Sequence, residues 1–508
     1  MPDHREIELK LSFDPKDRAL LARHPLLRGQ AHRPVTRRLA ALYFDTPDLA
    51  LKRAGLYLRL RRDGRRVVQT VKRQAPAGPL QDRDEFEAVL DGEAPRPDLV
   101  PDPDLRAFLC SDDVGPRLTP VFTTDIRRTR RMVSDGRGGE VCLDIDVGSI
   151  QAASGGEAAV AVNEIELELR SGSVDSLFAV ALDLQRDLPL RLVPSSKAER
   201  GYGLVAGDPA AAPAKARVPE LEAALPVGRA IAAVLGSGIE QVMANEAAVR
   251  AGIDPEGVHQ MRVGLRRLRS ALSLFADVLD PARRQAISSE LKWLQSALGP
   301  ARELDVFRAE ALAPVAAAMG EEDGLSPLAR RTDVAIALAY DAARGALASP
   351  RYTRLLLELA RWQAAIAADP GLSGPVEPFA AALLERRLKS VRKAGRGLAR
   401  APVERQHDVR IRLKKLRYGA DFFRSIFHEK HARRFIARMS AVQEILGHLN
   451  DGAVLGRVLA GVCGGDPALA RAEGLVLGWH ARARQGQLDG LKAAWRRFGE
   501  AEPFWRPG

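Results

Sequence analysis

The chain has 508 residues, of which 46% are hydrophobic, and a formal net charge of +12 with a sequence pI of about 9.9. This length predicts two to four domains. The positive charge favours an anionic partner such as nucleic acid, anionic lipid or polyphosphate. No apolar run is long enough to cross a membrane, and the first residues show no apolar export signal, so we expect a cytoplasmic protein without a membrane partner.

Short segments in which charged and apolar residues alternate recur through residues 1–205. Such alternation predicts β-strands, because neighbouring side chains of a strand point to opposite faces. The charged members of these segments are Glu6, Glu8, Lys10, Arg59, Arg61, Glu85, Glu87, Asp144, Asp146, Glu164, Glu166 and Glu168. Periodicity alone leaves two interpretations open: a closed barrel with a charged interior, and a half-buried sheet with a charged outer face.

Turn residues separate these strands into hairpins. Asp63-Gly64 lies between predicted strands at 56–62 and 66–73, and a glycine-rich turn at 135–139 joins two later strands. Hairpins of this kind predict an antiparallel sheet or barrel.

The composition changes after the β-rich part. Residues 206–219 are rich in alanine and proline and lack periodicity, so we expect a linker there. Residues 220–508 are rich in Ala, Leu and Arg at helical spacing, which predicts an all-helical domain. The predicted fold class is therefore α+β, with an antiparallel β domain at 1–205 followed by an all-α domain.

The helical part contains an internal repeat. Segments 258–269 and 406–417 are similar, and His407 follows His259 by 148 residues (407 − 259). A Leu-Gly pair further along each segment repeats at the same offset. A constant offset indicates a duplication, with two copies in a pseudo-twofold arrangement. The two copies are expected at about 220–365 and 370–508.

Three predicted helices carry basic residues at positions i, i+3, i+7 and i+10. Such residues lie within roughly 80° of one another along about 15 Å of helix. A solvated surface is the ordinary explanation, but here like charges stack with few acids between them, which destabilises a helix unless an anion binds. Few aromatic residues lie nearby, which disfavours nucleic acid. The predicted polyanion-binding residues are His259, Arg262, Arg266, Arg269, Arg386, Lys389, Lys393, Arg396, His407, Arg410, Lys414 and Arg417.

Residues 1–205 resemble the CYTH domain of the triphosphate tunnel metalloenzymes. The resemblance rests on motifs in the family's order: Glu6-x-Glu8-x-Lys10, Arg59-x-Arg61, Lys72, Arg83-x-Glu85-x-Glu87, Arg128-x-Arg130, Glu164-x-Glu166-x-Glu168 and Ser196-Lys197. It implies an eight-stranded antiparallel β tunnel that hydrolyses inorganic triphosphate, or a related compound, with Mg²⁺ or Mn²⁺. Because the family also includes adenylyl cyclases and thiamine-triphosphate hydrolases, the choice among these substrates stays open.

The resemblance also suggests roles for individual residues. Mg²⁺ binds hard carboxylate oxygens, and we expect Glu6, Glu8, Glu166 and Glu168 to hold it. Basic side chains hold the phosphates in phosphoryl transfer. The residues expected to do so are Lys10, Arg59, Arg61, Lys72, Arg128, Arg130, Lys197 and Arg200. Glu85 and Glu87 are expected to orient basic residues by ion pairing.

Residues 220–508 resemble the CHAD domain, a helical domain with recurrent histidines, and the whole chain is similar to bacterial CYTH–CHAD proteins. The resemblance rests on the repeats that begin at His259 and His407 and on the Leu-Gly motifs. It implies two four-helix halves with a basic surface that binds polyphosphate, and polyphosphate granules as an additional location. The expected function is a metal-dependent triphosphatase whose helical domain binds polyphosphate. The alternative is a non-catalytic protein in which both domains hold polyphosphate.

Overall fold

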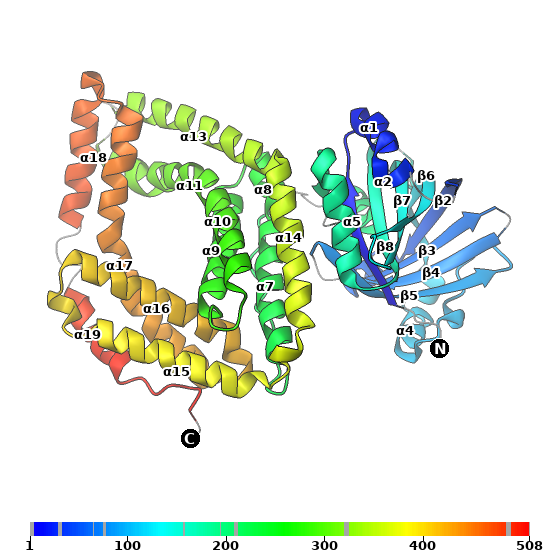
Figure 1. The fold of residues 1–508 in the computed structure, drawn as a ribbon. Coiled ribbons are helices and arrows are strands. Elements are labelled where there is room, and N and C mark those ends of the chain that lie inside the picture. Colours follow the sequence, from blue (N-terminus) through cyan, green and yellow to red (C-terminus); the bar gives the residue numbers. More distant parts are fainter. Residues whose placement is uncertain are drawn as a thin grey trace. The chain divides into compact units, whose positions relative to one another are not determined.

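A computed structural model describes residues 5–28, 33–64, 66–74, 78–155, 158–193, 195–207, 212–319, 325–483 and 489–506 (Figure 1). The chain divides into two compact units, residues 1–211 with 348–364 and residues 212–347 with 365–508. The first unit contains the β-sheet and the second is helical, so the predicted α+β class is confirmed. The boundary after residue 211 lies inside the segment predicted as a linker.

The strands of the first unit pair into a closed antiparallel barrel. Their order is β5-β4-β3-β2-β6-β7-β8-β1, and β1 also pairs with β5, which closes the ring. A short ninth strand, β9, extends the sheet beside β1. The strands are β1 (Arg5–Ser12), β2 (Val35–Asp45), β3 (Leu56–Asp63), β4 (Arg66–Arg73), β5 (Leu80–Leu90), β6 (Thr119–Ser134), β7 (Glu140–Ala152), β8 (Ala159–Ser171) and β9 (Arg191–Leu192).

Strand register decides which side chains enter the barrel. Across β1 and β8, Glu8 lies opposite Glu168 and Lys10 lies opposite Glu166. These charged residues face the interior, whereas the alternating Leu9 is fully buried on the other side. Of the two interpretations that periodicity left open, the closed barrel with a charged interior is therefore the correct one.

Short helices cover the outside of the barrel. On β3 and β4, the apolar residues that alternate with the charged ones join a buried cluster with residues before and within α4. Within residues 1–211 the helices are α1 (Arg18–Arg23), α2 (Pro25–Arg28), α3 (Ala50–Arg53), α4 (Pro103–Leu109), α5 (Val174–Asp187) and α6 (Lys197–Ala206). The charges therefore stay inside because the outer face is already occupied by apolar packing.

The remaining helices follow residue 212. They are α7 (Val227–Ala244), α8 (Glu246–Ala251), α9 (Pro255–Leu274), α10 (Pro281–Ala297), α11 (Gly299–Val306), the π-helix η4 (Phe307–Leu312), α12 (Ala313–Met319), α13 (Leu325–Ala348), α14 (Pro350–Ala367), α15 (Val376–Ala394), α16 (Val403–Phe423), α17 (Glu429–Cys463), α18 (Ala470–Ala483) and α19 (Asp489–Gly499). Among the described residues, none of these helices has the length and apolar composition that crossing a membrane requires.

The duplication is visible in the positions of the helices. Helices α9 and α16 begin 148 residues apart (403 − 255), and so do α10 and α17 (429 − 281). The segments before α7 and α15 form a reciprocal pair of backbone hydrogen bonds: Val227 N–H donates to Gly374 O and Val376 N–H donates to Leu225 O, both at 2.9 Å. Equivalent positions that pair with each other in this way are what a pseudo-twofold axis produces.

The two copies differ at one helix break. In the first copy, α10 ends before Leu298 and α11 begins at Gly299-Pro300. Proline has no N–H to continue a helical ladder. At the equivalent position the second copy has His448, which does have a backbone N–H, and α17 runs uninterrupted over 35 residues. One continuous helix therefore replaces two shorter ones.

Candidate functional site

The barrel encloses a polar cavity of about 710 Å³. Its walls come from β1, β2, β3, β4, β5, β6 and β8, together with the first turn of α6. The residues expected to bind metal or phosphate all line it except Arg200: they are Glu6, Glu8, Lys10, Arg59, Arg61, Lys72, Arg128, Arg130, Glu166, Glu168 and Lys197. Arg200 lies on α6 and forms an ion pair with Glu164.

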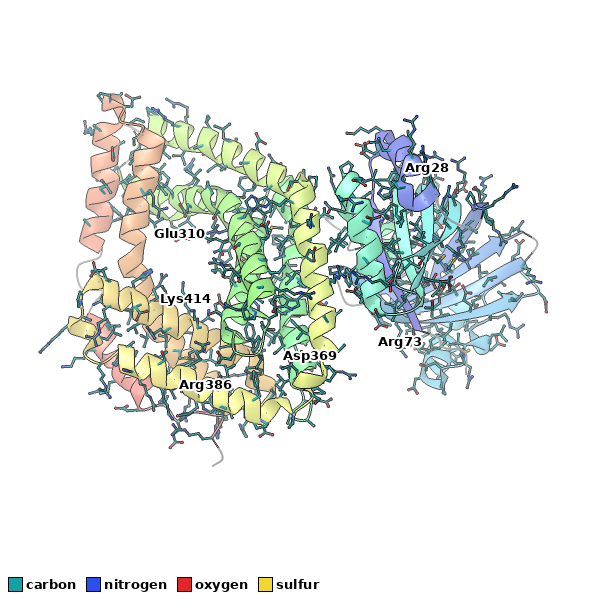
Figure 2. The ribbon with its side chains drawn as sticks, in the orientation of Figure 1. Arg28, Arg73, Glu310, Asp369, Arg386 and Lys414 are labelled. Carbon is teal, nitrogen blue, oxygen red and sulfur yellow. The ribbon has the colours of Figure 1, made fainter. Side chains whose placement is uncertain are left out.

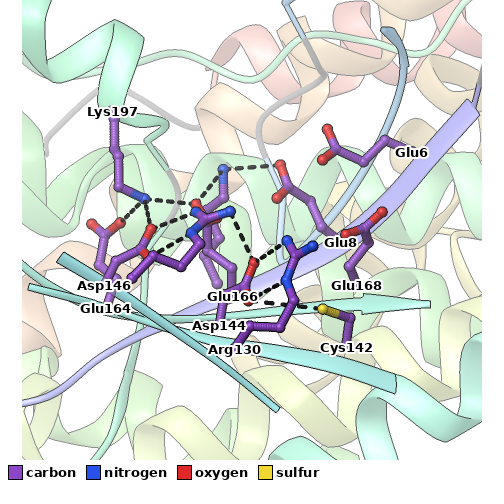
Figure 3. A network of polar contacts seen from close by, with 12 residues as sticks. Glu6, Glu8, Arg130, Cys142, Asp144, Asp146, Glu164, Glu166, Glu168 and Lys197 are labelled. Carbon is purple, nitrogen blue, oxygen red and sulfur yellow. Dashed lines mark hydrogen bonds and ion pairs between the residues drawn. The ribbon is translucent and has the colours of Figure 1, made fainter. Parts of the chain in front are cut away.

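One wall of the cavity is a continuous network of ion pairs (Figure 3). Lys197 Nζ lies 2.8 Å from Asp146 and 2.7 Å from Glu166. Arg128 donates two hydrogen bonds to Asp146, at 2.7 and 2.6 Å, and also pairs with Glu166. Each cation therefore contacts more than one carboxylate, which fixes its position in the cavity.

Lys10 joins the same network from β1. Its Nζ lies 2.9 Å from Glu8 and 3.4 Å from Glu166, and its side chain is only 4% exposed. Burial alone would raise the pKa of Glu166, but Lys197, Lys10 and Arg128 together hold that pKa well below its usual range. Glu166 is therefore charged and surrounded by cations.

The opposite wall confirms the expected role of Glu85 and Glu87. Lys72 Nζ lies 2.8 Å from Glu6 and 2.9 Å from Glu85. Arg59 lies 3.4 Å from Glu85, and Arg61 lies 3.3 Å from Glu87. Burial, followed by the charge of Arg59, lowers the pKa of Arg61. Two arginines held this close together favour an anion between them.

The carboxylates at the start of β1 and the end of β8 have the donor chemistry of a divalent-cation site. Glu8 and Glu168 lie directly opposite across two antiparallel strands, where like charges repel. Burial and the nearby Glu6 carboxylate raise the pKa of Glu168 to about 7, against the opposing charge of Arg170. A cation would relieve this repulsion. In the described part of the chain, however, no three acidic, histidine or cysteine side chains are gathered into a closed metal cluster.

Sequence reasoning noted Asp144 and Asp146 but assigned them no role. Asp146 is fully buried, and Asp144 accepts two hydrogen bonds from Arg130, at 2.8 and 2.7 Å. Both carboxylates lie directly opposite arginines across β6 and β7. The motif Arg128-x-Arg130 facing a second alternating acidic strand is the signal that would have identified them.

The first basic row of the helical unit lies on α9 and is partly covered by α10 and α11. Arg262 donates to the Gln295 carbonyl oxygen, and Arg269 donates to the Gln295 side chain, both at 2.6 Å. In the second copy, Arg417 donates to the equivalent Gln443 at 2.8 Å. The last arginine of each row is therefore held in the same way, as duplication predicts.

The third row lies on α15 except for Arg396, which follows the end of that helix at Ala394, so the predicted helical spacing does not extend to it. Its members Arg386, Lys389, Lys393 and Arg396 are all exposed. Figure 2 shows Arg386 on α15 and Lys414 on the adjacent helix α16. Arg386 pairs with Asp277 at 3.3 Å, so one cation of this row is partly neutralised.

Arg302 on α11 lies beside the first basic row and was not among the residues predicted to bind a polyanion. Burial and the charge of Arg302 lower the pKa of His259, and burial and Arg266 lower the pKa of Arg262. Four basic side chains thus crowd together in the first copy, those of His259, Arg262, Arg266 and Arg302. Since Arg302 comes from a different helix, the spacing along α9 could not reveal it.

Comparison with known proteins matches each part of the chain to a domain family. The model of the CYTH domain matches residues 4–202, and the model of the CHAD domain matches residues 233–460. An uncharacterized protein of Mycobacterium tuberculosis is 30% identical over 422 residues, which is 76% of each chain.

Two further relatives match one part each. A protein of Haemophilus influenzae named inorganic triphosphatase is 29% identical over 205 residues, which is 39% of this chain. The match covers 54% of the Haemophilus protein, so this chain spans about half of its length. The crystal structure of the CHAD domain from the plant Ricinus communis is 34% identical, with a TM-score of 0.51, and the match covers 56% of this chain and 96% of that one.

Proposed function

We propose a function from one premise: this chain belongs to the family of proteins that join a CYTH domain to a CHAD domain. The proposed reaction is hydrolysis of inorganic triphosphate, or a closely related triphosphate, in the barrel with Mg²⁺ or Mn²⁺. The observation that carries it is a single cavity in which cations from β1, β3, β4, β6 and α6 face carboxylates of β1, β5 and β8. The name of the Haemophilus relative supports the same reaction.

The basic residues would bind and neutralise the substrate. Triphosphate is a dense anion, and phosphoryl transfer depends on positioning and charge neutralisation more than on covalent chemistry. Arg59 and Arg128 can each offer a planar fork to a phosphate, while Lys10 and Lys72 act as point charges. Because carboxylates already hold these cations in the cavity, little side-chain entropy is lost when the substrate binds.

Glu6, Glu8 and Glu168 are the residues we assign to the divalent cation. Glu166 is the fourth candidate, although Lys197, Lys10 and Arg128 surround it. A bound cation would neutralise phosphate charge and activate or position water. The proposed task of the carboxylates is to hold it beside the phosphate-binding arginines.

Replacing Glu8 by Gln tests the catalytic proposal. The variant should lose roughly 100-fold or more of the triphosphatase rate while its circular dichroism stays unchanged. Glu93→Gln is the matched control, because Glu93 pairs with Arg62 and its side chain is 72% exposed. Equal rates for both variants and the wild type would exclude the proposed site.

We further propose that the helical unit binds inorganic polyphosphate through its basic rows. Replacing Arg262, Arg266, Arg410 and Lys414 by Ala should weaken polyphosphate binding far more than it lowers the melting temperature. Binding should also weaken steeply with salt, because a polyanion releases condensed counterions when it binds. Equal affinity in the quadruple variant would leave a solvated basic face as the explanation.

One observation favours the non-catalytic alternative. Within the described residues the cavity carboxylates pair with cations and do not gather into a metal cluster. A barrel that only holds polyphosphate would share this arrangement. Phosphate release from triphosphate separates the two functions, since a holding protein releases none.

A further inference from the structure

We infer that the barrel cavity opens at one end only, so that it acts on the free end of a linear phosphate chain and does not admit the middle of one. This inference rests on the proposed function of the barrel as a site for phosphate chains. It concerns the shape of the substrate, which the charges in the cavity do not specify.

The closed end is built from apolar residues that point into the barrel. Since neighbouring strands run antiparallel, the last residues of β2 and β7 and the first residues of β3, β6 and β8 meet at the same end. The inward residues there are Tyr43, Tyr57, Phe122, Ile150 and Val162. None of their side chains is more than 5% exposed, and they belong to one buried cluster. The cavity cations therefore stop before this end, where the one buried carboxylate of β2, Asp45, accepts backbone hydrogen bonds from Thr46, Leu51 and Lys52.

Aromatic rings connect the walls across this end. Tyr43 stacks on Phe122 with ring centroids 4.4 Å apart, and Phe122 meets Tyr202 of α6 edge-on at 5.1 Å. Tyr57 lies 5.9 Å from Tyr202. We call these four residues the aromatic floor. Tyr43 and Tyr57 also line the cavity, so the floor is the surface on which the cavity ends.

Helix α6 seals the floor from outside. A Cβ atom at Gly201 would lie only 2.3 Å from the ring of Phe122, so the helix backbone rests directly on that ring. A capping box fixes the first turn of α6, and both Lys197 and Arg200 pair with the buried Glu164. The helix is therefore anchored at its start by backbone and by charge.

The other end of the cavity is open. Among its lining residues, the side chains of Glu87 and Arg130 are each 45% exposed, and that of Arg170 is 42% exposed. These residues come from the strand ends opposite the floor. By contrast, the cations nearest the floor are shielded, with Lys10 4% and Lys197 11% exposed. Exposure thus falls along the cavity from this mouth to the floor.

The chemistry of the floor excludes a chain that passes through it. Phosphate oxygens would have to leave the cations and cross aromatic and aliphatic side chains, where a buried charge without partners is very costly. A chain with a free end can instead place its terminal phosphate beside Lys10 and Lys197. The substrate class is therefore linear phosphate chains with an exposed terminal phosphate, such as inorganic triphosphate and the ends of longer polyphosphates.

The test uses full-length protein, Mg²⁺ and phosphate release. Three substrates are compared: triphosphate, medium-length polyphosphate with free ends, and the same polyphosphate with both ends capped as phosphodiesters. The free-ended substrates should release phosphate, and the capped chain should react at least about 100-fold more slowly, because its end cannot pair with the buried cations. Cleavage of the capped chain at a rate close to that of the free-ended chain would overturn the inference.

If the protein does not hydrolyse triphosphate, only the catalytic proposal is refuted. A binding experiment then still tests whether the cavity requires a free chain end. Linear triphosphate and cyclic trimetaphosphate contain the same number of phosphates, but the ring has no end. In metal-free buffer, triphosphate should raise the melting temperature of the wild type more than that of Lys10→Met, and this difference isolates binding in the barrel. Trimetaphosphate should give no such difference. Equal differences for both ligands would show that a free end is not required.

Discussion

Replacing Asp146 by Asn should weaken the barrel strands around it by about 3 kcal/mol. Asp146 is fully buried and accepts two hydrogen bonds from Arg128, while Lys197 Nζ lies 2.8 Å away. Removing one partner of a buried ion pair costs about 3–5 kcal/mol, because a charge is left without compensation. Glu166 still contacts both cations, so we expect the lower end of this range.

Asp125→Asn, on the neighbouring strand β6, is the matched control. Asp125 points outward from β6 and accepts two hydrogen bonds from Arg38, so it repeats the bidentate geometry of the Asp146 pair. The two side chains are 77% and 47% exposed. An exposed pair of this kind contributes little to stability, because water and salt screen the charges.

Hydrogen-exchange mass spectrometry is the suitable assay, since it reads the β6 and β7 peptides separately from the helical unit. A loss of about 3 kcal/mol corresponds to roughly 100-fold faster exchange of the most protected amides. Asp125→Asn should change the same amides by less than about tenfold. If the two variants exchange alike, the carboxylates inside the barrel do not stabilise its cations.

Three further outcomes are expected. Gly201→Ala should destabilise the barrel by about 1–3 kcal/mol, because the added Cβ would overlap with Phe122. Gly203→Ala is the control and should not destabilise it, because its Cβ would meet no atom within 4 Å. Hydrogen exchange of the α6 amides measures both effects. Polyphosphate affinity should rise as pH falls, mainly below about 6.5, because burial and Arg302 lower the pKa of His259 and its charge appears only when it is protonated. Fluorescence anisotropy titrations at several pH values check this, and His259→Gln should reduce the rise. Arg302→Ala should weaken polyphosphate binding several-fold in the same assay, and an unchanged affinity would remove Arg302 from the site.

The sequence predicted strands and their charged faces but could not decide whether those faces point inward. Alternation has the same period in either case, since it reports only that two faces differ. The decision comes from the pairing of β1 with both β5 and β8, which closes the barrel. These are contacts between distant segments, and no local pattern encodes them.

The candidate site was likewise predictable from the sequence in part only. Once a barrel was assumed, the alternation of side chains along each strand placed Lys10 and Arg59 inside it, and the structure puts both on the cavity wall. Asp146 and Tyr43 were not assigned, because their roles depend on cross-strand register and on the docking of α6. Arg302 was missed for a related reason, as it reaches His259 from a neighbouring helix.

The most direct measurement is phosphate release from inorganic triphosphate by the full-length protein with Mg²⁺, after chelation with EDTA, and again after Mg²⁺ is restored in excess. For the wild type, the proposed function predicts phosphate release that stops on chelation and returns with the metal. For Glu8→Gln, it predicts no release under any of the three conditions. Release that continues at the same rate in EDTA, or that persists in Glu8→Gln, would contradict a metal-dependent triphosphatase built on the carboxylates of β1.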